Sequence, residues 1–513
     1  MSCKFHFGLH LRYPHSIILF KGYLMDKQLK RNLWFFPLGT VGRDMLYQLF
    51  TNYILLYVLF TRQLTAAQLM AITVIMVLCR VFDAVNDPVM GNIIECTRSR
   101  WGKYKPWLVI GILSTSIVVY LAFSVPLQGW PFVIFFGIIY FLYSITFTMQ
   151  DISYWGMVPA LGRDSHSRDQ FTSRATLFAG IGATLAGIII PMLTTGSMTV
   201  GGNAQSAYSN VALLFSILAP LFLCFTIFGV RENRDTPVSA GSKIGVRKII
   251  TTIKNNDQLV WIAVIFLLQQ IGINMILGGL GSTYIYFAFG YEGGLYSTFS
   301  TIGVLATAFL MVFYPAISAR IRRKQLMKYM LFMSLAAYAL MIAAGVLMPS
   351  SMIKFWAITL CYMFSNLGQY AYYLVMMISI INTVEYNEYK NGTRDEAIIA
   401  SLRPFLTKLS SALVILLTSL SYLAFGVTDI TNKISSLEQQ TNLGLITEAE
   451  KLSSIGSVLS GVRSYQTLGL ILVMAILPAL LMTLAYKLYM KHYILDEDEY
   501  DRILKVLDER KEK

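Results

Sequence analysis

The sequence carries little charge for its length. Of its 513 residues only 14% are Asp, Glu, Lys or Arg, whereas 55% are hydrophobic and the mean hydropathy is +0.57. A soluble domain carries about 25% charged residues. The shortage of charge therefore argues against a soluble protein and predicts a chain that crosses a membrane many times.

Cysteine and histidine are also scarce, and their positions exclude two kinds of site. The cysteines are scattered without a C-x-x-C pair, so we expect small apolar fillers rather than a disulfide framework or a zinc site. The histidines all lie outside the apolar runs, which excludes a histidine proton relay inside the membrane. The residues are Cys3, Cys79, Cys96, Cys224 and Cys361, and His6, His10, His15, His166 and His492.

Apolar runs of spanning length are what the sequence has in abundance. Each is near or above the roughly 20 residues that a spanning helix needs, and helices are required because lipid offers backbone groups no partner. The twelve runs cover residues 34–61, 66–95, 106–126, 131–158, 174–199, 208–230, 258–289, 296–319, 326–348, 354–385, 397–426 and 464–488. The predicted fold class is an all-α membrane protein with twelve transmembrane helices.

The net charge of +14 is spread over alternate loops instead of forming one patch, which disfavours nucleic-acid binding. Lysine and arginine cluster in residues 98–105, 163–168, 231–254, 320–328 and 390–394. The loops between these clusters, such as SVPLQGWP, carry almost no positive charge. By the positive-inside rule, both termini are predicted to be cytoplasmic.

The longest early loop divides the spans into two sets of six, as in a transporter with two pseudo-symmetric halves. The predicted units are a cytoplasmic N-terminal segment (1–30), an N-terminal six-helix bundle (31–230), a central cytoplasmic loop (231–257), a C-terminal six-helix bundle (258–490) and a cytoplasmic tail (491–513).

Three segments outside the spans carry expectations of their own. The first 24 residues are basic, and either Met25 is the true initiator or they form a disordered cytoplasmic tail. The loop 427–463 contains TEAEKLSSIGSVLSGV, which favours an amphipathic surface helix with a structural role over a gate. The tail DEDEYDRILKVLDERKEK predicts a helix of mixed charge with a solvated face.

Ionisable side chains inside the spans are rare and therefore informative. Each costs about 2.5–3.5 kcal/mol on insertion scales, and such residues tend to mark substrate or ion paths. They are Asp44, Asp83, Asp87, Asp151, Arg43, Arg80, Arg174, Arg403 and Lys408. All the acids belong to the first half of the chain, whereas the second half supplies only bases.

Asp83 and Asp87 are four residues apart and share one helical face, roughly 6 Å apart along the axis. Two bare carboxylates at that separation repel, so either one keeps a proton or a cation lies between them. Ligand sets made only of oxygen suit hard cations, and Thr148 and Asp151 add a hydroxyl and a third carboxylate. The structural alternative is that Arg80 pairs with these acids and simply packs the helix.

Sugar recognition is the second interpretation of the intramembrane polar groups. Sugars are held by carboxylates that accept hydroxyl hydrogens and by aromatic faces that cover the ring. TFTMQDISYWGMVP places Asp151 and Trp155 four residues apart on one helical face, which is such a pair. Tyr370, Tyr372 and Tyr373 form a further aromatic cluster, for which a place in the core or the interfacial belt is the alternative.

Four stretches carry a family resemblance. FDAVNDPVMGN followed by TRSRWGKYKPW, then DISYWGMVPAL and VEYNEYKNGTRDEA, resemble the glycoside–pentoside–hexuronide:cation symporter family of the major facilitator superfamily. The resemblance covers about residues 30–495. It implies a major facilitator fold of 6+6 helices that imports a glycoside by symport with Na⁺, Li⁺ or H⁺ through alternating access.

The resemblance also implies partners. They are a sugar (a di- or oligosaccharide, pentoside or hexuronide), a monovalent cation and the lipid of the plasma (inner) membrane. No nucleic acid and no cofactor beyond the coupling cation are implied, and a monomer suffices. By motif position the cation falls on Asp83, Asp87, Thr148 and Asp151. Shared use of Asp151 by cation and sugar would couple the two, each tightening the other by the same factor.

The sugar-contacting roles implied by the resemblance fall mainly on four residues of the first half. They are Asp44, Asp151, Trp155 and Arg174, with Lys408 close by, Arg43 as a weaker candidate and Tyr373 where the family has a tryptophan. Arg403 departs from the family pattern, and it either answers an acidic sugar or pairs with an acid across the cavity.

Three alternatives to sugar symport stay open. One is a lipid or lysophospholipid carrier of a related branch, against which the pair Asp151 and Trp155 favours sugar. Another is a passive sugar facilitator. The third, a membrane enzyme or receptor, finds no support, since the sequence shows no nucleophile–base pair, phosphate loop or metal cluster.

Overall fold

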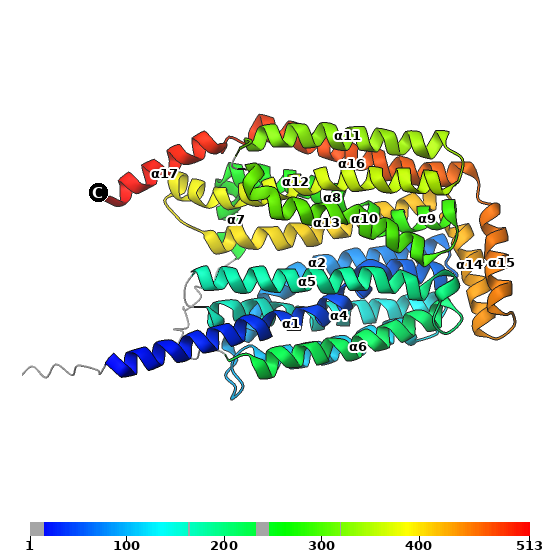
Figure 1. Cartoon of the computed structure of the whole chain (residues 1–513), viewed down its shortest axis with the longest axis horizontal. Helices are drawn as coiled ribbons and strands as arrows, with labels where there is room; N and C mark the ends of the chain where they lie inside the picture. The colour runs from blue at the N-terminus through cyan, green and yellow to red at the C-terminus, as the bar shows by residue number, and fades with distance from the viewer. Residues whose placement is uncertain (1–14, 163–164, 232–245, 319, 513) are drawn as a thin grey trace, which may run out of the picture.

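The computed structural model describes residues 15–162, 165–231, 246–318 and 320–512, and every regular element within them is a helix. Long helices run side by side along one axis in two groups (Figure 1). The first group comprises α1 (His15–Thr61), α2 (Ala66–Cys96), α3 (Lys105–Ser124), α4 (Gly129–Leu161), α5 (Ser165–Thr194) and α6 (Ala204–Gly229). The second group comprises α8 (Asp257–Asn274) with η2 (Ile276–Leu280) and α9 (Gly281–Phe289), then α10 (Gly293–Ser318), α11 (Arg323–Leu347), α12 (Met352–Asn391), α13 (Glu396–Ala424) and α16 (Ser464–His492).

The all-α prediction with twelve spans is confirmed. Among the described residues, 11 helical stretches are long and apolar enough to cross a membrane. The remaining span is α1, whose apolar character is diluted by Arg43, Asp44, Gln48 and Asn52. Its polar residues matter because they face the interior of the bundle, as described below.

The predicted apolar runs all fall on these helices, with two informative differences. Helix α5 begins at Ser165, ahead of the predicted 174, because a helix can start in a polar segment that hydropathy does not register. The predicted span 258–289 is interrupted at η2, where Gly279 has φ of 128°. Only glycine adopts that backbone conformation readily, since it has no Cβ. The Ser282 hydroxyl satisfies the freed Gly279 carbonyl at 2.8 Å.

Hydrogen bonds between the two groups of helices are concentrated, within the described residues, at one end of the bundle. This end carries α14 (Val427–Asn442) and α15 (Glu448–Ser460) and lies on the right in Figure 1. Leu64 and Asn432 exchange two hydrogen bonds of 2.8 and 2.9 Å. The Gly293 N–H donates to the Thr195 carbonyl at 3.2 Å. A Cβ on Gly293 would lie 1.7 Å from the Pro191 carbonyl oxygen, so this close approach of α5 and α10 requires glycine. The bundle is thus sealed at the α14–α15 end.

A buried ion pair fixes the α14–α15 hairpin to the first group of helices. Lys451 and Glu438 are 0% and 2% exposed, with Nζ 3.4 Å from Oε2. The same Glu438 oxygen accepts the Ala204 N–H at the start of α6 (2.7 Å), and Lys451 donates to the Gly202 carbonyl (2.7 Å). Burial raises the pKa of the Glu438 carboxyl, and the Lys451 ammonium opposes that rise. The surface helix expected in loop 427–463 is confirmed as α15, whereas α14 was not expected.

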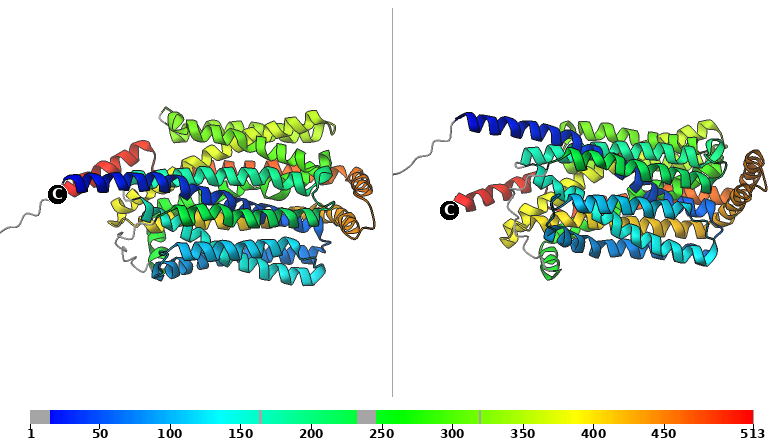
Figure 2. Two further views of the ribbon diagram at one scale, coloured as in Figure 1. Left: turned by 60° about the horizontal axis from the view of Figure 1, so that its bottom comes forward. Right: turned by 90° about the horizontal axis from the view of Figure 1, so that it is seen from below.

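Three segments outside the spans differ from expectation. The loop 231–257 contains a helix, α7 (Val246–Asn255), and residues 15–24 are part of α1 instead of a disordered tail. Residues 1–14 lie outside the described residues. The start of α1, the helix α7 and the helix α17 lie at the end of the bundle opposite α14 and α15 (Figures 1 and 2).

The mixed-charge helix expected in the tail is present as α17 (Glu497–Glu512), and it has a solvated face, but its opposite face is packed. Ile503 and Leu507, four residues apart on one face, are buried because α17 packs on α12. Ion pairs join the start of the tail to α11, with Asp496 2.8 Å from the Lys324 ammonium and Glu497 3.0 Å from the Arg323 guanidinium.

The buried ion pair makes the hairpin sensitive to loss of one partner. Lys451→Met leaves the Glu438 charge buried without its ammonium, which costs on the order of 3–5 kcal/mol. We expect a clearly lower thermal unfolding temperature in detergent micelles. Lys433→Met, at an exposed position of the same helix pair, is the matched control and should shift stability by no more than about 0.5 kcal/mol. Equal unfolding temperatures for the two variants would contradict the structural role of the pair.

Candidate functional site

Helix α1 is buried on every side but one between residues 41 and 62. The side chains in this range that are not buried are Asp44, Tyr47, Gln48, Thr51 and Asn52. Spacings of three and four residues place them on one helical face. The rest of α1 packs mainly on α5 and α6, and the open face borders a cavity that α10 also lines. This polar stripe, defined as these five residues, is one wall of the space between the two groups of helices.

At one end of the polar stripe, a single arginine holds two acids. The Arg43 guanidinium donates to Asp44 at 2.9 Å and to Asp151 on α4 at 3.1 Å. Its carbon lies 5.0 Å from the centre of the Tyr154 ring and 5.5 Å from that of Trp155. The Arg43 side chain is 5% exposed, whereas that of Asp151 is 38% exposed. We call these five residues (Arg43, Asp44, Asp151, Tyr154 and Trp155) the Arg43 cluster. The Arg43 cluster carries a net charge of −1 and presents a carboxylate and an aromatic ring toward open space.

A second cluster forms where α2 faces α4. Asp83 is buried and accepts a hydrogen bond from the Ser144 hydroxyl, and the Arg80 guanidinium lies 3.8 Å from its other oxygen. Asp87 accepts from the Thr148 hydroxyl at 3.1 Å. The Lys408 ammonium on α13 forms an ion pair with the second Asp87 oxygen. Two carboxylates from the first half therefore meet two cationic groups, one of them from the second half.

The ion pair between Arg80 and Asp83 is weak in geometry. At 3.8 Å it exceeds hydrogen-bond distance, and the Arg80 Nε and Nη2 atoms have no hydrogen-bond partner among the described residues. The structural alternative foreseen from the sequence, in which Arg80 pairs with the acids of α2, is met at Asp83 and not at Asp87. Asp87 depends on Lys408 instead.

One face of α4 links the two clusters. Ser144, Thr148 and Asp151 lie at positions i, i+4 and i+7, and each binds a charged side chain of a different position on α1 or α2. Trp155 continues this face by one more turn. Helix α4 therefore holds the acids of α2 and the Arg43 cluster at a fixed spacing along its axis.

The three acids expected to share a cation are not gathered into one ligand set. Among the described residues there is no group of three or more His, Cys, Asp or Glu side chains arranged to hold a metal ion. Asp83 and Asp87 lie on α2, whereas Asp151 is drawn to Arg43 on α1. Thr148, by contrast, is beside Asp87 as expected.

The remaining candidates lie apart from the Arg43 cluster. Arg174 on α5 donates to the Leu33 carbonyl at 3.4 Å, and its guanidinium lies 5.7 Å from the centre of the Trp34 ring. Arg403 on α13 donates to the Tyr373 hydroxyl at 3.2 Å. Neither contact involves an acid. Both arginines are exposed in this conformation.

The predicted tyrosine cluster divides in two. Tyr370 and Tyr373 lie with ring centres 5.4 Å apart, next to Arg403. Tyr372 is fully buried and donates to the Met327 carbonyl at 3.0 Å, so it is a core residue. The interpretation as core is confirmed for Tyr372, and Tyr373 is partly buried against the same core.

Sequence reasoning missed several polar groups. Ser144 is signalled by its place four residues before Thr148, because a face that carries Thr148 and Asp151 carries position 144 as well. Gln48 and Asn52 continue the spacing of four residues from Asp44, and their amides join at 2.7 Å. The pairing of Asp87 with Lys408 has no local signal, since 321 residues separate the two.

The membrane-length helices lie in two groups, and a lysine of one group pairs with an acid inside the other. This arrangement is that of a multi-pass membrane protein with the major facilitator fold. The chain belongs to the MFS/sugar transport protein family, whose model matches residues 35–497. The resemblance carried by the four sequence stretches is thereby confirmed.

Characterised and named relatives agree with this membership. A lactose permease of Lactobacillus helveticus is 29% identical over 415 residues, covering 77% of this chain and 62% of that protein. The raffinose carrier protein of Pediococcus pentosaceus is 24% identical over 484 residues, covering 92% and 70%. The putative glycoside/cation symporter YagG of Escherichia coli (strain K12) is 24% identical over 338 residues, covering 65% and 70%. The family and these relatives are membrane transporters and not enzymes.

The chain is shorter than some of these relatives. It spans 62% and 60% of the lactose permeases of Lactobacillus helveticus and Leuconostoc lactis. Solved structures show the fold alone. A bacterial homologue of the lysosomal transporter Spinster matches with a TM-score of 0.58 at 13% identity, over 91% of this chain and 98% of the other. A D-xylose–proton symporter matches with a TM-score of 0.54 at 12% identity, over 89% and 97%.

The contact between Asp87 and Lys408 is testable by a double-mutant cycle. We expect Asp87→Asn and Lys408→Met each to lower stability, and the double variant to lose about 0.5–3 kcal/mol less than the sum, because the two side chains interact directly. Denaturant unfolding in detergent micelles measures these changes. The control cycle of Asp87→Asn with the exposed Lys433→Met should be additive within about 0.5 kcal/mol. Additivity in the first cycle as well would exclude the ion pair.

Proposed function

We propose that the protein is a secondary active transporter that moves a glycoside together with Na⁺, Li⁺ or H⁺ by alternating access. The observation that carries the proposal is the face of α4 on which Thr148 meets Asp87 and Asp151 meets Arg43. It places oxygen groups suited to a small cation next to a carboxylate and a ring suited to a sugar. The names of the relatives, which include lactose permease, raffinose carrier and glycoside/cation symporter, support the same function.

The proposed cation site is the oxygen cluster of Asp83, Asp87 and Thr148. These are hard ligands, as Na⁺ and Li⁺ prefer, and a carboxylate can alternatively take up a proton. Asp151 was expected to join them, but Arg43 holds one of its oxygens at 3.1 Å. We therefore place Asp151 primarily in the sugar site, joined to the cation site through α4.

Lys408 has a defined task in this proposal. Two carboxylates one turn apart repel when no cation is bound, and a lone buried charge is costly. The Lys408 ammonium neutralises Asp87 in the empty carrier, and it comes from the opposite half of the protein. A coupling cation that enters the cluster replaces Lys408 and thereby releases α13 from α2. Cation binding and the relative movement of the halves are coupled by this exchange.

The proposed sugar site is the Arg43 cluster. Asp44 and Asp151 accept hydrogen bonds from sugar hydroxyl groups, and Arg43 orients both carboxylates. Trp155, four residues after Asp151, covers the apolar face of the ring. Lys408, once displaced by the cation, is available to a sugar hydroxyl. Charge-assisted hydrogen bonds of this kind contribute more than neutral ones, which favours specific binding of a polar ligand.

We propose sugar contacts for three further residues only in another conformation of the carrier. They are Arg174, Arg403 and Tyr373. None of them touches the Arg43 cluster in this conformation. Arg174 contacts Leu33 and Trp34, and Arg403 donates to the Tyr373 hydroxyl. A second arginine near the substrate path would favour an acidic sugar such as a hexuronide. A passive facilitator has no need for the buried acid Asp83, and no observation favours a lipid headgroup over a sugar.

The orientation of the carrier follows from its charged loops. The positive clusters 98–105, 320–328 and 390–394 lie at the end of the bundle that carries α7 and α17. We therefore place the protein in the plasma (inner) membrane with this end in the cytoplasm. The sealed α14–α15 end then faces outward. We infer from this that the conformation is inward-facing, and we propose that the halves 31–230 and 258–490 move against each other to open the outer side.

Uptake into proteoliposomes tests the function. Neutral glycosides and glucuronides, each crossed with Na⁺, Li⁺ and a pH gradient, should identify at least one sugar that accumulates only with a cation gradient. Asp87→Asn removes a ligand charge and should reduce cation-stimulated uptake by at least about tenfold, equivalent to about 1.4 kcal/mol. Asp169→Asn, at an exposed position of α5, is the control and should retain it. Undiminished cation stimulation in Asp87→Asn would refute the cation site.

Coupling through α4 also predicts reciprocity at equilibrium. If Na⁺ or Li⁺ tightens sugar binding by a given factor, the sugar must tighten binding of that cation by the same factor. Calorimetric titration of the purified protein with each ligand, in the presence and absence of the other, measures both factors. Asp151→Asn should weaken sugar binding more than cation binding, because Asp151 belongs to the Arg43 cluster. Equal losses for the two ligands would place Asp151 in the cation site instead.

A further inference from the structure

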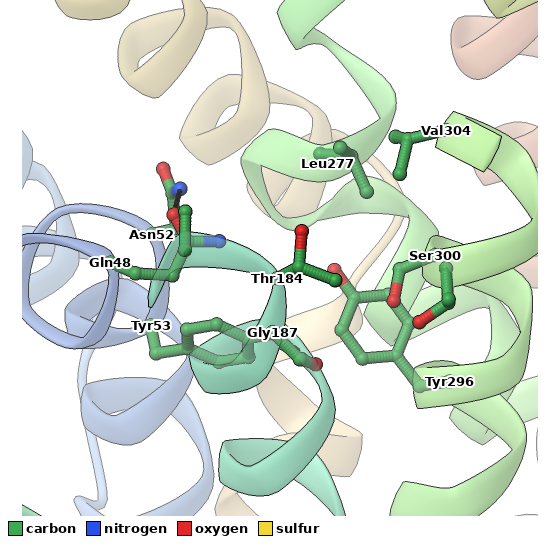
Figure 3. Close-up of a pocket in the computed structure, with 11 residues that line it drawn as sticks. Gln48, Asn52, Tyr53, Thr184, Gly187, Leu277, Tyr296, Ser300 and Val304 are labelled. Atoms are coloured by element: carbon green, nitrogen blue, oxygen red, sulfur yellow. Dashed lines mark hydrogen bonds between the residues drawn. The ribbon is translucent and has the colours of Figure 1, made fainter. Parts of the chain in front are cut away.

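A cavity of about 180 Å³ lies beyond the Arg43 cluster, between the two halves of the protein. It is lined by Gln48, Asn52 and Tyr53 of α1, by Ala183, Thr184 and Gly187 of α5, by Leu277 of η2 and by Tyr296, Ser300, Thr301 and Val304 of α10 (Figure 3). This volume is many times the roughly 10–15 Å³ that a single water needs, so the cavity admits a ligand much larger than water.

The cavity continues the polar stripe of α1. Gln48 is one turn beyond Asp44 and Asn52 is a further turn on, so the cavity begins roughly 6 Å along the helix axis from the proposed sugar site. Gln48 and Asn52 join at 2.7 Å, which leaves further donor and acceptor positions of both amides for a ligand. A ligand held at Asp44 and extending toward the sealed end would enter this cavity.

The lining has the chemistry of a neutral sugar site. It offers two amides, the hydroxyls of Thr184, Ser300 and Thr301, and two tyrosine rings, and it contains no charged side chain. Tyr296 turns its hydroxyl toward Thr184 across the cavity (Figure 3). Amide and hydroxyl groups suit the hydroxyls of an uncharged ring, whereas a carboxylated sugar would find no cation to neutralise it. Because α10 belongs to the opposite half, the cavity is complete only when the halves meet at the α14–α15 end.

We propose that this cavity is a second sugar subsite, which takes a neutral ring of a di- or oligosaccharide whose first ring is held by Asp44 and Asp151. The inference rests on the proposed function and adds to it that the preferred substrate has more than one ring. Selectivity between a simple glycoside and a disaccharide then resides in α5 and α10, apart from the charged clusters.

The test compares substrates that differ by one or more rings. Lactose is paired with methyl β-galactoside, and raffinose with methyl α-galactoside, in proteoliposome uptake. Thr184→Val and Thr301→Val each remove a hydroxyl from the subsite. For the larger sugar of a transported pair, we expect KM to rise roughly 3- to 10-fold, as for loss of one hydrogen bond. KM for the methyl galactoside should change by less than about twofold.

The chain offers a matched control on the same helix. Thr298 of α10 donates to the Gly294 carbonyl at 2.9 Å, is partly exposed and does not line the cavity. Thr298→Val should leave KM for both sugars of a pair unchanged. Transport of the methyl galactoside shows in the same assay that each variant is folded, and Ser300→Ala supplies a smaller change if either valine variant fails to reach the membrane.

A filling variant gives the opposite test. A Cβ on Gly187 would meet only the Gln48 amide, at 4.0 Å, so the backbone tolerates a side chain there. Gly187→Leu should occupy the cavity and reduce kcat/KM for the larger sugar at least tenfold while the methyl galactoside is still transported. Equal effects on both sugars of a pair, or no effect on either, would overturn the subsite while leaving symport intact. Absence of cation-driven uptake of any glycoside by the unmodified protein would instead overturn the proposed function.

Discussion

The structure depends on pairing the acidic side chains that lie at bilayer depth with basic ones. Insertion of one such charge costs about 2.5–3.5 kcal/mol, and the first six helices hold four acids in their spans. Arg43 forms ion pairs with Asp44 and Asp151, at 2.9 and 3.1 Å. Lys408 forms an ion pair with Asp87. The last of these contacts crosses between halves of the protein. A constraint of solvation is therefore also a constraint on conformation, because the halves cannot separate around α2 and α13 without exposing or re-pairing two charges.

The polar faces of α1 and α4 line the interior of the bundle. The open face of α1 runs from Asp44 to Asn52, and the remainder of that segment is buried against α5 and α6. The facing side of α4 carries Ser144, Thr148 and Asp151, each in contact with a charged partner. Between them, polar groups are restricted to surfaces that meet inside the bundle. Lipid-facing positions such as Ile134 and Ile138 of α4, 64% and 56% exposed, are apolar. The same helices thus satisfy the membrane outside and a polar ligand inside.

Local pattern was sufficient for part of this picture. The twelve apolar runs and the shared face of Asp151 and Trp155 depend on composition and helical spacing, and both are readable in the sequence. The expectation that Thr148 lies beside Asp87 came from the family resemblance, because the two residues are on different helices. The ion-pair partner of Asp87 was not readable in the sequence, because Lys408 is distant in the chain and only the packing of α13 on α2 brings it there. The double ion pair of Arg43 was not readable for a related reason. Its importance comes from Asp151 on another helix, and adjacency to Asp44 alone did not reveal it. The α14–α15 hairpin likewise depends on a buried ion pair between segments that look like a polar loop.

Charge balance determines what the proposed exchange at Asp87 can accomplish. With Lys408 in place, Asp83 and Asp87 are matched by Arg80 and Lys408, and the cluster is neutral. A monovalent cation added to that cluster would leave an excess positive charge in a poor dielectric, so its entry favours the departure of Lys408. The Arg43 cluster carries one excess negative charge and is joined to this site by α4, so it attracts the displaced Lys408 ammonium. A displaced ammonium and a sugar hydroxyl are then drawn to the same carboxylates, Asp44 and Asp151. In the proposed mechanism, the cation therefore changes the electrostatics of the sugar site without touching the sugar, and the balance of charges, more than any single contact, joins the two binding events.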